Sequence, residues 1–263
     1  MLAQRVASAA VGIPVIVLLI ILGGNWYVAA VAAALAVAAV EFQHMRRDWL
    51  DPVCLLTGAL VAGIAVGAHV GTTEWAAWLV GATVIAPLAS LARPATGDTL
   101  MDALWTLGAV TYVGFLGSFI VLLRDIDFDA RSWVFLAVFA TFATDTGAFF
   151  TGRAIGRHLL APRISPKKTV EGFFGGCAAG FAAVVLLAFV FDLGIEPWKI
   201  SLLGLLLPPV AALGDLAESG IKRLAHVKDA SELIPGHGGV LDRLDSILLT
   251  LTLVYLFTEW VVY

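Results

Sequence analysis

Long apolar runs separated by short polar breaks make up almost the whole chain. The runs are rich in Leu, Ala, Val and Ile, and most are close to the ~20 residues that an α-helix needs to cross a bilayer core. Strands of a membrane barrel would instead alternate apolar and polar positions over about ten residues. The pattern therefore predicts about nine helical membrane spans, at 6–23, 26–43, 53–71, 74–92, 102–123, 132–151, 172–191, 198–217 and 244–262.

The composition supports this interpretation. Hydrophobic residues make up 60% of the 263 residues, charged residues only 14%, and the mean hydropathy is +0.94, far from the balance of soluble proteins. We therefore expect an all-α integral membrane protein, a polytopic bundle forming a single transmembrane domain over residues 1–263. The first apolar run follows Arg5 and could be taken for a signal peptide, but no soluble domain follows it, so we expect a retained first span. Cys54 and Cys177 are isolated in apolar stretches and are predicted to be packing residues.

The basic residues predict the orientation of the chain. With a cytoplasmic N-terminus, three basic residues lie outside, namely Arg124, Arg131 and Lys199. The cytoplasmic side then carries Arg5, Arg46, Arg47, Arg93, Arg153, Arg157, Arg163, Lys167, Lys168, Lys222, Arg223, Lys228 and Arg243. Because cytoplasmic loops are enriched in Lys and Arg, we expect the N-terminus in the cytoplasm and the C-terminus outside. The two long loops, 152–171 and 218–243, would then face the cytoplasm.

Several carboxylates lie within or beside the predicted spans. Asp145 is about 13 residues into its span, ~20 Å deep at 1.5 Å per residue, where an unpaired carboxylate is costly and needs a polar cavity, a cation or a basic partner. Asp215 lies near the inner end of the eighth span, and Ser219 follows on the same helical face. Asp242 and Asp245 are three residues apart at the inner start of the last span. Four carboxylates are thus predicted at one depth, in the oxygen-rich environment that Mg²⁺ prefers.

Each carboxylate taken alone has a structural alternative. Asp242 or Asp245 could cap a helix or interact with its dipole, and Asp145 could pair with Arg153. These alternatives explain the single residues better than they explain the set.

Basic and glycine-rich segments complement the carboxylates. Lys167 and Lys168 stand beside Thr169, which could cap the seventh span, and a helix N-terminus with two ammonium groups suits phosphate. A membrane-surface anchor is an equally good interpretation of these lysines, and the same ambiguity applies to the basic residues Lys222, Arg223 and Lys228. His237 is flanked by glycines, which permit positive φ and a close approach to a ligand. Gly172, Gly176 and Gly180 recur every four residues and indicate close helix packing or a dimer face.

A site with these groups suggests phosphoryl or nucleotidyl transfer, and its depth suggests a lipid phosphate. The sequence contains no GxxxxGK[ST] motif, so a P-loop nucleotide site is excluded.

Two segments resemble the phosphatidate cytidylyltransferases, also called CDP-diacylglycerol synthases. The first combines SGIKR at 219–223, KD at 228–229 and PGHGGVLDRLD at 235–245, with no departure from the family signature. The second, DTGAFFTGRAIGRHLLAPRISPKKTVEG at 145–172, matches another shared region, except that Phe149 stands where Tyr is expected. Together they cover about a fifth of the chain, and the remaining spans are similar only in being apolar and in their number.

The resemblance implies transfer of CMP from CTP to phosphatidate, with a divalent metal, in a bacterial inner-membrane enzyme that forms a homodimer and has no nucleic-acid partner. The site would face the cytoplasm, within a catalytic half at about 132–263. Asp215, Ser219 and Asp242 hold the positions of the family's metal centre.

The other roles are hypotheses about this site. Asp245 and Asp145 would assist with Mg²⁺, and a second mono- or divalent cation could share the site. The candidate catalytic residues are Asp215, Asp242, Lys222, Arg223, His237 and Arg243. The candidate phosphate-binding residues are Ser165, Lys167, Lys168, Lys228, Gly238 and Gly239.

Two other classes of protein remain open at this point. A CTP-dependent polyprenol kinase would share the nucleotide and the membrane but release CDP rather than pyrophosphate. A secondary transporter would use Asp145 and Asp215 for ion coupling and could be broken at Pro208-Pro209, although transporters tend to show paired repeats and sites at the bilayer midplane.

Overall fold

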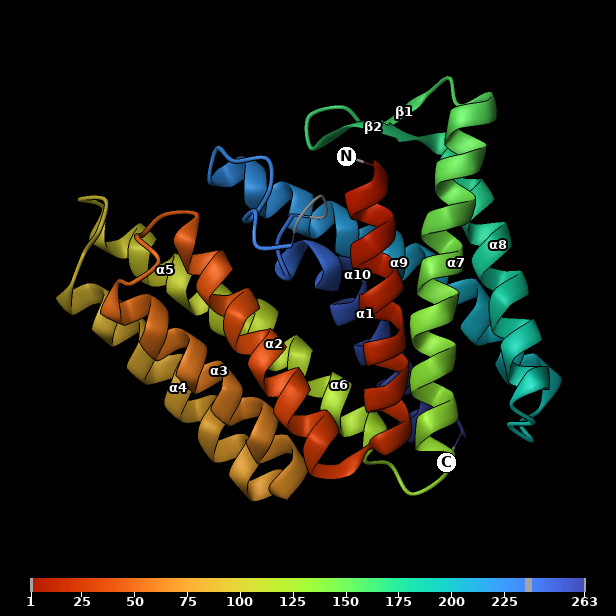
Figure 1. The fold of residues 1–263 in the computed structure, drawn as a ribbon, viewed down its shortest axis with the longest axis horizontal. Coiled ribbons are helices and arrows are strands. Elements are labelled where there is room, and N and C mark those ends of the chain that lie inside the picture. The colour runs from red at the N-terminus through yellow and green to blue at the C-terminus, as the bar shows by residue number, and fades with distance from the viewer. Residues whose placement is uncertain (1, 235–237, 263) are drawn as a thin grey trace. The chain divides into compact units, whose positions relative to one another are not determined.

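The structure, a computed structural model, describes residues 2–234 and 238–262, and these are almost entirely helical. The helices are α1 (Leu2–Leu22), α2 (Gly24–His44), α3 (Pro52–Val70), α4 (Thr72–Ala92), α5 (Thr99–Ala109), α6 (Leu116–Arg124), α7 (Ala130–Ile155), α8 (Val170–Val190), α9 (Pro197–Leu224) and α10 (Leu241–Phe257). Two π-helical segments, η1 (Val110–Phe115) and η2 (Thr258–Val262), continue α5 and α10. A hairpin of two short strands, β1 (Leu159–Ala161) and β2 (Ser165–Thr169), connects α7 to α8 (Figure 1).

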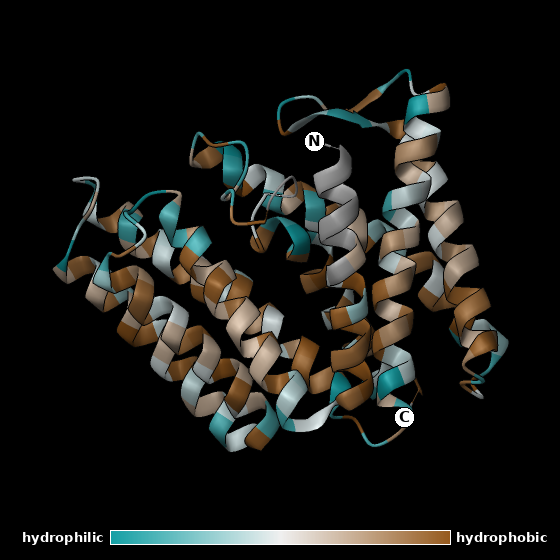
Figure 2. Cartoon of the chain, in the orientation of Figure 1, coloured by the Kyte–Doolittle hydropathy of each residue, from teal (hydrophilic) through white to brown (hydrophobic). Residues whose placement is uncertain are grey.

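The predicted spans coincide with helices. Eight helices in the described ranges are long and apolar enough to cross a membrane, counting α5, η1 and α6 as one helix over Thr99–Arg124. The first predicted span coincides with α1, whose described apolar part is Gly12–Leu22. Hydrophobic residues follow these helices and hydrophilic ones gather at helix ends and in the hairpin (Figure 2). The prediction of an all-α membrane protein is confirmed, while the sidedness of the termini stays a prediction.

The loops predicted at 152–171 and 218–243 are shorter in the structure. α7 continues to Ile155, the hairpin occupies most of the first loop, α9 runs on to Leu224 and α10 begins at Leu241. The polar residues that suggested a loop after position 217 are compatible with a helix, because Lys222 pairs with Glu218 one turn earlier at 2.7 Å. α9 also continues through Pro208 and Pro209 without a break.

The chain forms two compact units. Unit 1 contains residues 1–125 and 225–244, and unit 2 contains residues 126–224 and 245–263, so the boundary falls within the first turns of α10. Most of the predicted catalytic half belongs to unit 2, but residues 225–244 belong to unit 1.

Unit 1 is a layer of helices in which α3 packs against both α2 and α4. One core cluster joins Leu60 and Ile64 of α3 to Ala82 and Ala86 of α4 and to Val110 of η1. Cys54 is fully buried in α3, as expected of a packing residue.

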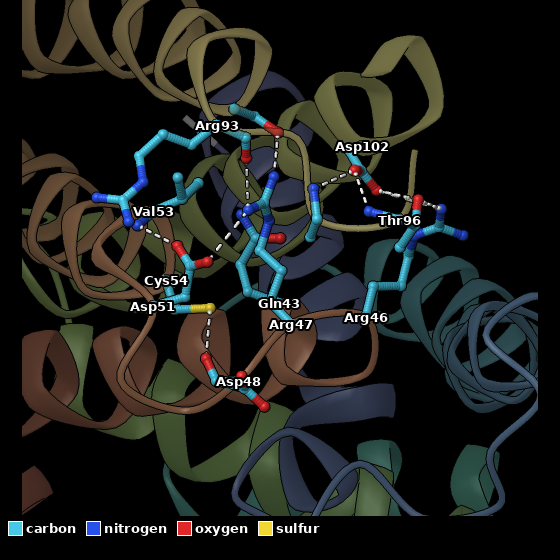
Figure 3. Close-up of polar contacts among 12 residues, drawn as sticks. Gln43, Arg46, Arg47, Asp48, Asp51, Val53, Cys54, Arg93, Thr96 and Asp102 are labelled. Carbon is cyan, nitrogen blue, oxygen red and sulfur yellow. Dashed lines mark hydrogen bonds and ion pairs between the residues drawn. The ribbon is translucent and has the colours of Figure 1, made fainter. Parts of the chain in front are cut away.

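Polar residues tie the ends of α2, α4 and α5 together (Figure 3). Arg47, at 7% exposure, donates to the Arg93 carbonyl at 2.9 Å and to Ser90 Oγ at 2.7 Å. Arg46 donates to Asp102 Oδ1 at 3.2 Å and to Thr96 Oγ1 at 3.0 Å. These bonds connect the segments that follow α2 and α4.

In unit 2, α7 and α8 pack through small residues. A Cβ on Gly176 would lie 2.9 Å from the Thr144 carbonyl, and one on Gly172 would lie 2.9 Å from the Ala148 carbonyl. A Cβ on Gly180 would collide with the Thr144 side chain. The repeated glycines therefore serve close helix packing within the chain, one of the two alternatives expected for them. Cys177 lies in the same helix, is half-buried and forms no disulfide.

Candidate active site

Asp215 of α9 is the centre of a polar group in unit 2. Its Oδ2 lies 2.5 Å from the Nζ of Lys168, at the end of β2, and its Oδ1 accepts a hydrogen bond from Ser219 Oγ at 3.4 Å. The side chains of Lys168 and Asp215 are 24% and 31% exposed. The structure thus brings together three of the predicted residues, and the helical spacing of Asp215 and Ser219 is confirmed.

The hairpin positions Lys168 beside the start of α8. Thr169 has extended backbone angles, and its Oγ1 accepts a hydrogen bond from Gly172 N at 3.1 Å, so the predicted cap is confirmed. Glu171 accepts hydrogen bonds from the backbone N–H groups of Arg157 and His158 at 3.0 and 3.2 Å. Sequence reasoning missed this role of Glu171, which holds the segment between α7 and the hairpin.

Three other candidate phosphate-binding or catalytic residues with basic side chains lie on α9 and β2 of unit 2, namely Lys167, Lys222 and Arg223. Lys222 pairs with the buried Glu218, and Arg223 donates from Nε to the Ile164 carbonyl at 3.3 Å, which connects α9 to the hairpin turn. On β2, Lys167 is exposed and Ser165 is half-buried. These cationic groups and the helix start offer charge for binding phosphate.

α9 packs closely on α10 near Asp215 and near Asp245, another predicted metal ligand. A Cβ on Gly214 would lie 2.7 Å from the Asp245 carbonyl and 2.9 Å from Ser246 Cα. Asp245 itself is half-buried, and Asp145 is exposed on α7. Gly214, the residue before Asp215, therefore lies against the backbone of Asp245 and Ser246.

Asp242 binds the backbone of a segment of unit 1 that we call the signature segment, residues 230–234 and 238–242. This carboxylate, at 7% exposure, accepts hydrogen bonds from Gly239 N at 2.7 Å and from Ala230 N at 3.1 Å. Gly238 has φ +79°, and a Cβ there would lie 2.7 Å from Asp242 Oδ2. The positive φ expected near His237 is thus found at Gly238, whereas His237 itself lies outside the described residues. In the same segment, Arg243 and Lys228 are exposed.

Glu41 of α2 also binds this segment, and sequence reasoning missed it. The side chain is fully buried, and its two oxygens accept hydrogen bonds from Ser231 Oγ, Val240 N and Leu241 N at 2.6, 3.0 and 2.7 Å. The sequence did contain a signal for Glu41, because a carboxylate within an apolar span is costly unless it has partners.

A cavity of about 580 Å³ lies beside the segment within unit 1. The imidazole of His44 and the indole of Trp49 form one part of its lining and stack on each other, with ring centroids 4.3 Å apart. Met45 and the run 227–232 complete the lining. The cavity therefore borders Ala230 and Ser231, the residues that bind Asp242 and Glu41.

The predicted metal ligands are divided between the two units. Asp145, Asp215, Ser219 and Asp245 belong to unit 2, and Asp242 belongs to unit 1. Within residues 2–234 and 238–262, no group of three or more His, Cys, Asp or Glu side chains could hold a metal ion. The chemistry of the donors nevertheless fits Mg²⁺, because Asp215 already attracts one cation, Lys168, and carries a hydroxyl oxygen beside it.

Comparisons with known proteins all find similarity to cytidylyltransferases. The sequence matches the cytidylyltransferase family over residues 3–261. A phosphatidate cytidylyltransferase of Mycobacterium bovis is 35% identical over 260 residues, which cover 94% of this chain and 84% of that protein. Those of Staphylococcus haemolyticus and Bacillus subtilis are both 39% identical, over 156 and 150 residues. The chain matches 59% and 55% of the length of these two relatives, and the matches cover 59% and 57% of the chain.

Proposed function

We propose that this chain, which belongs to the cytidylyltransferase family, transfers CMP from CTP to phosphatidate and so forms CDP-diacylglycerol and pyrophosphate. The observation that carries the proposal is the family match over nearly the whole chain, together with the name of the mycobacterial relative. The polar group around Asp215 supports it, because it combines anionic oxygen ligands with cations suited to phosphate.

The reaction needs little proton transfer. Phosphatidate is a phosphomonoester whose second pKa is near ~6, so it already presents an anionic oxygen at neutral pH. That oxygen attacks the α-phosphorus of CTP and forms a new P–O–P bond. The bond between the α-phosphorus and its bridging oxygen breaks, and pyrophosphate leaves with the electron pair. The protein's contribution is then placement of the two substrates and neutralisation of their charge.

The basic residues would bind and neutralise the phosphate groups of the two substrates. Lys168 lies beside Asp215 and the start of α8, where its ammonium group can bind a phosphate oxygen. The other predicted cations, Lys167, Lys222, Arg223 and Lys228, would neutralise the triphosphate and the lipid phosphate. Ser165 and Gly238 would donate hydrogen bonds to phosphate oxygens, and Gly239 would let the backbone approach them closely. His237 would shape the nucleotide turn, and Arg243 would orient Asp242 or bind phosphate.

Asp215, Ser219 and Asp242 would hold Mg²⁺, assisted by Asp245 or Asp145, and a second mono- or divalent cation is part of the same proposal. When bound, the metal would draw charge from the phosphate oxygens around the α-phosphorus. Ser219 orients Asp215 by donating a hydrogen bond to it, and backbone N–H groups orient Asp242.

The predicted orientation places this chemistry at the cytoplasmic surface, where CTP is available, in a bacterial inner membrane. A homodimer is part of the same proposal, based on the family resemblance.

The test is pyrophosphate release by the purified full chain in mixed micelles, with CTP, Mg²⁺ and phosphatidate each omitted in turn. Release that needs all three components, with CDP-diacylglycerol as the lipid product, is the expected result. Release of CDP on addition of a polyprenol would instead favour the kinase alternative, and no turnover with either lipid would refute both.

A further inference from the structure

We propose that Glu41 is a positioning residue that fixes the backbone of the signature segment at residues 230–231 and 239–241 and so orients the carboxylate of Asp242. The proposal rests on the proposed function for its effect on turnover, and on unit 1 alone for its geometry.

Both oxygens of Glu41 are used. Oε1 accepts from Ser231 Oγ at 2.6 Å and from Val240 N at 3.0 Å, and Oε2 accepts from Leu241 N at 2.7 Å. The three donors lie 190 to 200 residues further along the chain. A carboxylate suits this position because each of these partners is a donor and the site needs acceptors only.

The contacts of Glu41 and Asp242 alternate along the segment. Asp242 binds Ala230 N and Gly239 N, whereas Glu41 binds the next residue in each case, Ser231 and Val240. The backbone that fixes Asp242 is therefore fixed on its other side by Glu41. Loss of Glu41 would free both stretches that donate to Asp242.

Glu41 also caps the start of α10 from another helix. Val240 N and Leu241 N belong to the N-terminal end of this helix, where N–H groups have no intrahelical acceptor. A negative charge at this end is favoured by the helix dipole. Asp242 lies in the same first turn, so an ordered start of α10 also sets the direction of its side chain.

Gly239 provides independent support. A Cβ there would lie 2.7 Å from each carboxylate oxygen of Glu41. Glycine at 239 is therefore needed for the close approach of Glu41, and the PGHGG motif is partly explained by a residue far from it in sequence.

The cost of burying this acid indicates a role in orientation. A fully buried carboxylate near the end of a membrane span loses its hydration, and the three hydrogen-bond donors described for Glu41 are uncharged. Apolar packing can stabilise a core as well as a buried charge does, but it would not fix the direction of three donors.

The main variant is Glu41→Gln, studied in the full chain in mixed micelles. Glutamine keeps the volume but presents an NH₂ group to one of the donors. We expect kcat to fall and the Mg²⁺ concentration for half-maximal activity to rise by about 10- to 100-fold, the range seen for residues that orient metal ligands. Hydrogen exchange by mass spectrometry should be faster in peptides covering 230–242 and unchanged in α3.

Matched variants separate orientation from folding. Ser231→Ala removes one of the three bonds and should give a smaller change in the same direction, about 3-fold. Glu41→Asp keeps the carboxylate and should recover part of the activity. Glu74→Gln changes an acid in the first turn of α4, beside Gly67 and Gly71, and should behave like the wild type.

Wild-type Mg²⁺ dependence and unchanged exchange in Glu41→Gln would overturn the proposal. So would a loss of folded protein in which the remaining folded fraction is fully active. If Glu41→Gln does not accumulate, Ser231→Ala and Glu41→Asp decide by the same measurements. If the wild type itself makes no CDP-diacylglycerol, the proposed function fails, and the exchange comparison still decides whether Glu41 holds the segment.

Discussion

Asp102 and Asp215 show two ways in which this protein uses a carboxylate near a helix end. Asp102, at 2% exposure, accepts hydrogen bonds from Ala95 N, Thr96 N, Thr96 Oγ1 and Arg46, at 2.8, 3.0, 2.9 and 3.2 Å (Figure 3). A carboxylate has about four acceptor positions, so the four donors fill them.

Asp215 has a different environment. Its side chain is 31% exposed and interacts with a flexible lysine and a hydroxyl at 3.4 Å, rather than with a cage of backbone N–H groups. The pair is partly solvent-accessible, and ion pairs at the surface contribute only about 0–1 kcal/mol, so the ammonium group can move to another anion. The comparison teaches that Asp102 has all its acceptor positions filled by donors of the surrounding loop and helix ends and therefore serves the fold, whereas Asp215 keeps an exchangeable cation that a ligand could replace.

The largest expected effect is that of Asp215→Asn. Loss of the negative charge should reduce turnover by at least about 100-fold, as for the removal of a charge that acts directly at a transition state. The protein should remain folded in detergent, as judged by its elution volume and melting temperature. Activity near that of the wild type would show that Asp215 does not act at the metal.

Asp102→Asn should lower the stability of the protein and leave its activity nearly unchanged, the reverse of Asp215→Asn. The amide NH₂ faces donors that now lack an acceptor, so we expect a loss of about 2 kcal/mol in the free energy of unfolding. Activity per folded molecule should stay within about 2-fold of the wild type, because the described partners of Asp102, namely Arg46, Ala95 and Thr96, are not candidate site residues. A loss of turnover without a lower melting temperature would contradict the distinction between the two acids.

Lys168→Met tests the exchangeable cation. Removal of one phosphate-binding charge should raise the KM for CTP by about 10-fold, equal to ~1.4 kcal/mol, and weaken its dependence on salt. Lys199→Met is the matched control, since Lys199 is also a partly buried lysine of unit 2 and pairs with Glu196 at 2.7 Å. An equal effect in both variants would indicate a general effect of charge.

The smallest effect is expected for Thr169→Ala. Loss of the hydrogen bond to Gly172 N should lower the stability of α8 by about 1 kcal/mol, measured as a small decrease in melting temperature. At saturating CTP the rate should change by less than about 2-fold. A larger loss of activity than of stability would place the hydroxyl of Thr169 among the substrate-binding groups.

The sequence predicted local features well. Span positions follow from apolar runs, the Thr169 cap from its place before a helix, and the packing of Gly172, Gly176 and Gly180 from their spacing. The continuation of α9 to Leu224 was missed because its charged residues looked like a loop, although their i,i+4 spacing also suits a helix. Glu41 was missed because its donors lie 190 to 200 residues away, and no local pattern encodes such a contact.

α9 is longer than the hydrocarbon layer is thick, so its tilt depends on the surrounding lipid. Its 28 residues form a continuous rod of about 42 Å, whereas the hydrocarbon layer is only ~30 Å thick. Asp215, Ser219 and Arg223 occupy successive turns near one end of this rod, so any change in its tilt shifts their depth together. Acyl-chain length, which sets hydrophobic mismatch, would therefore adjust the depth of the proposed metal ligands Asp215 and Ser219, and of Arg223, relative to the lipid phosphate.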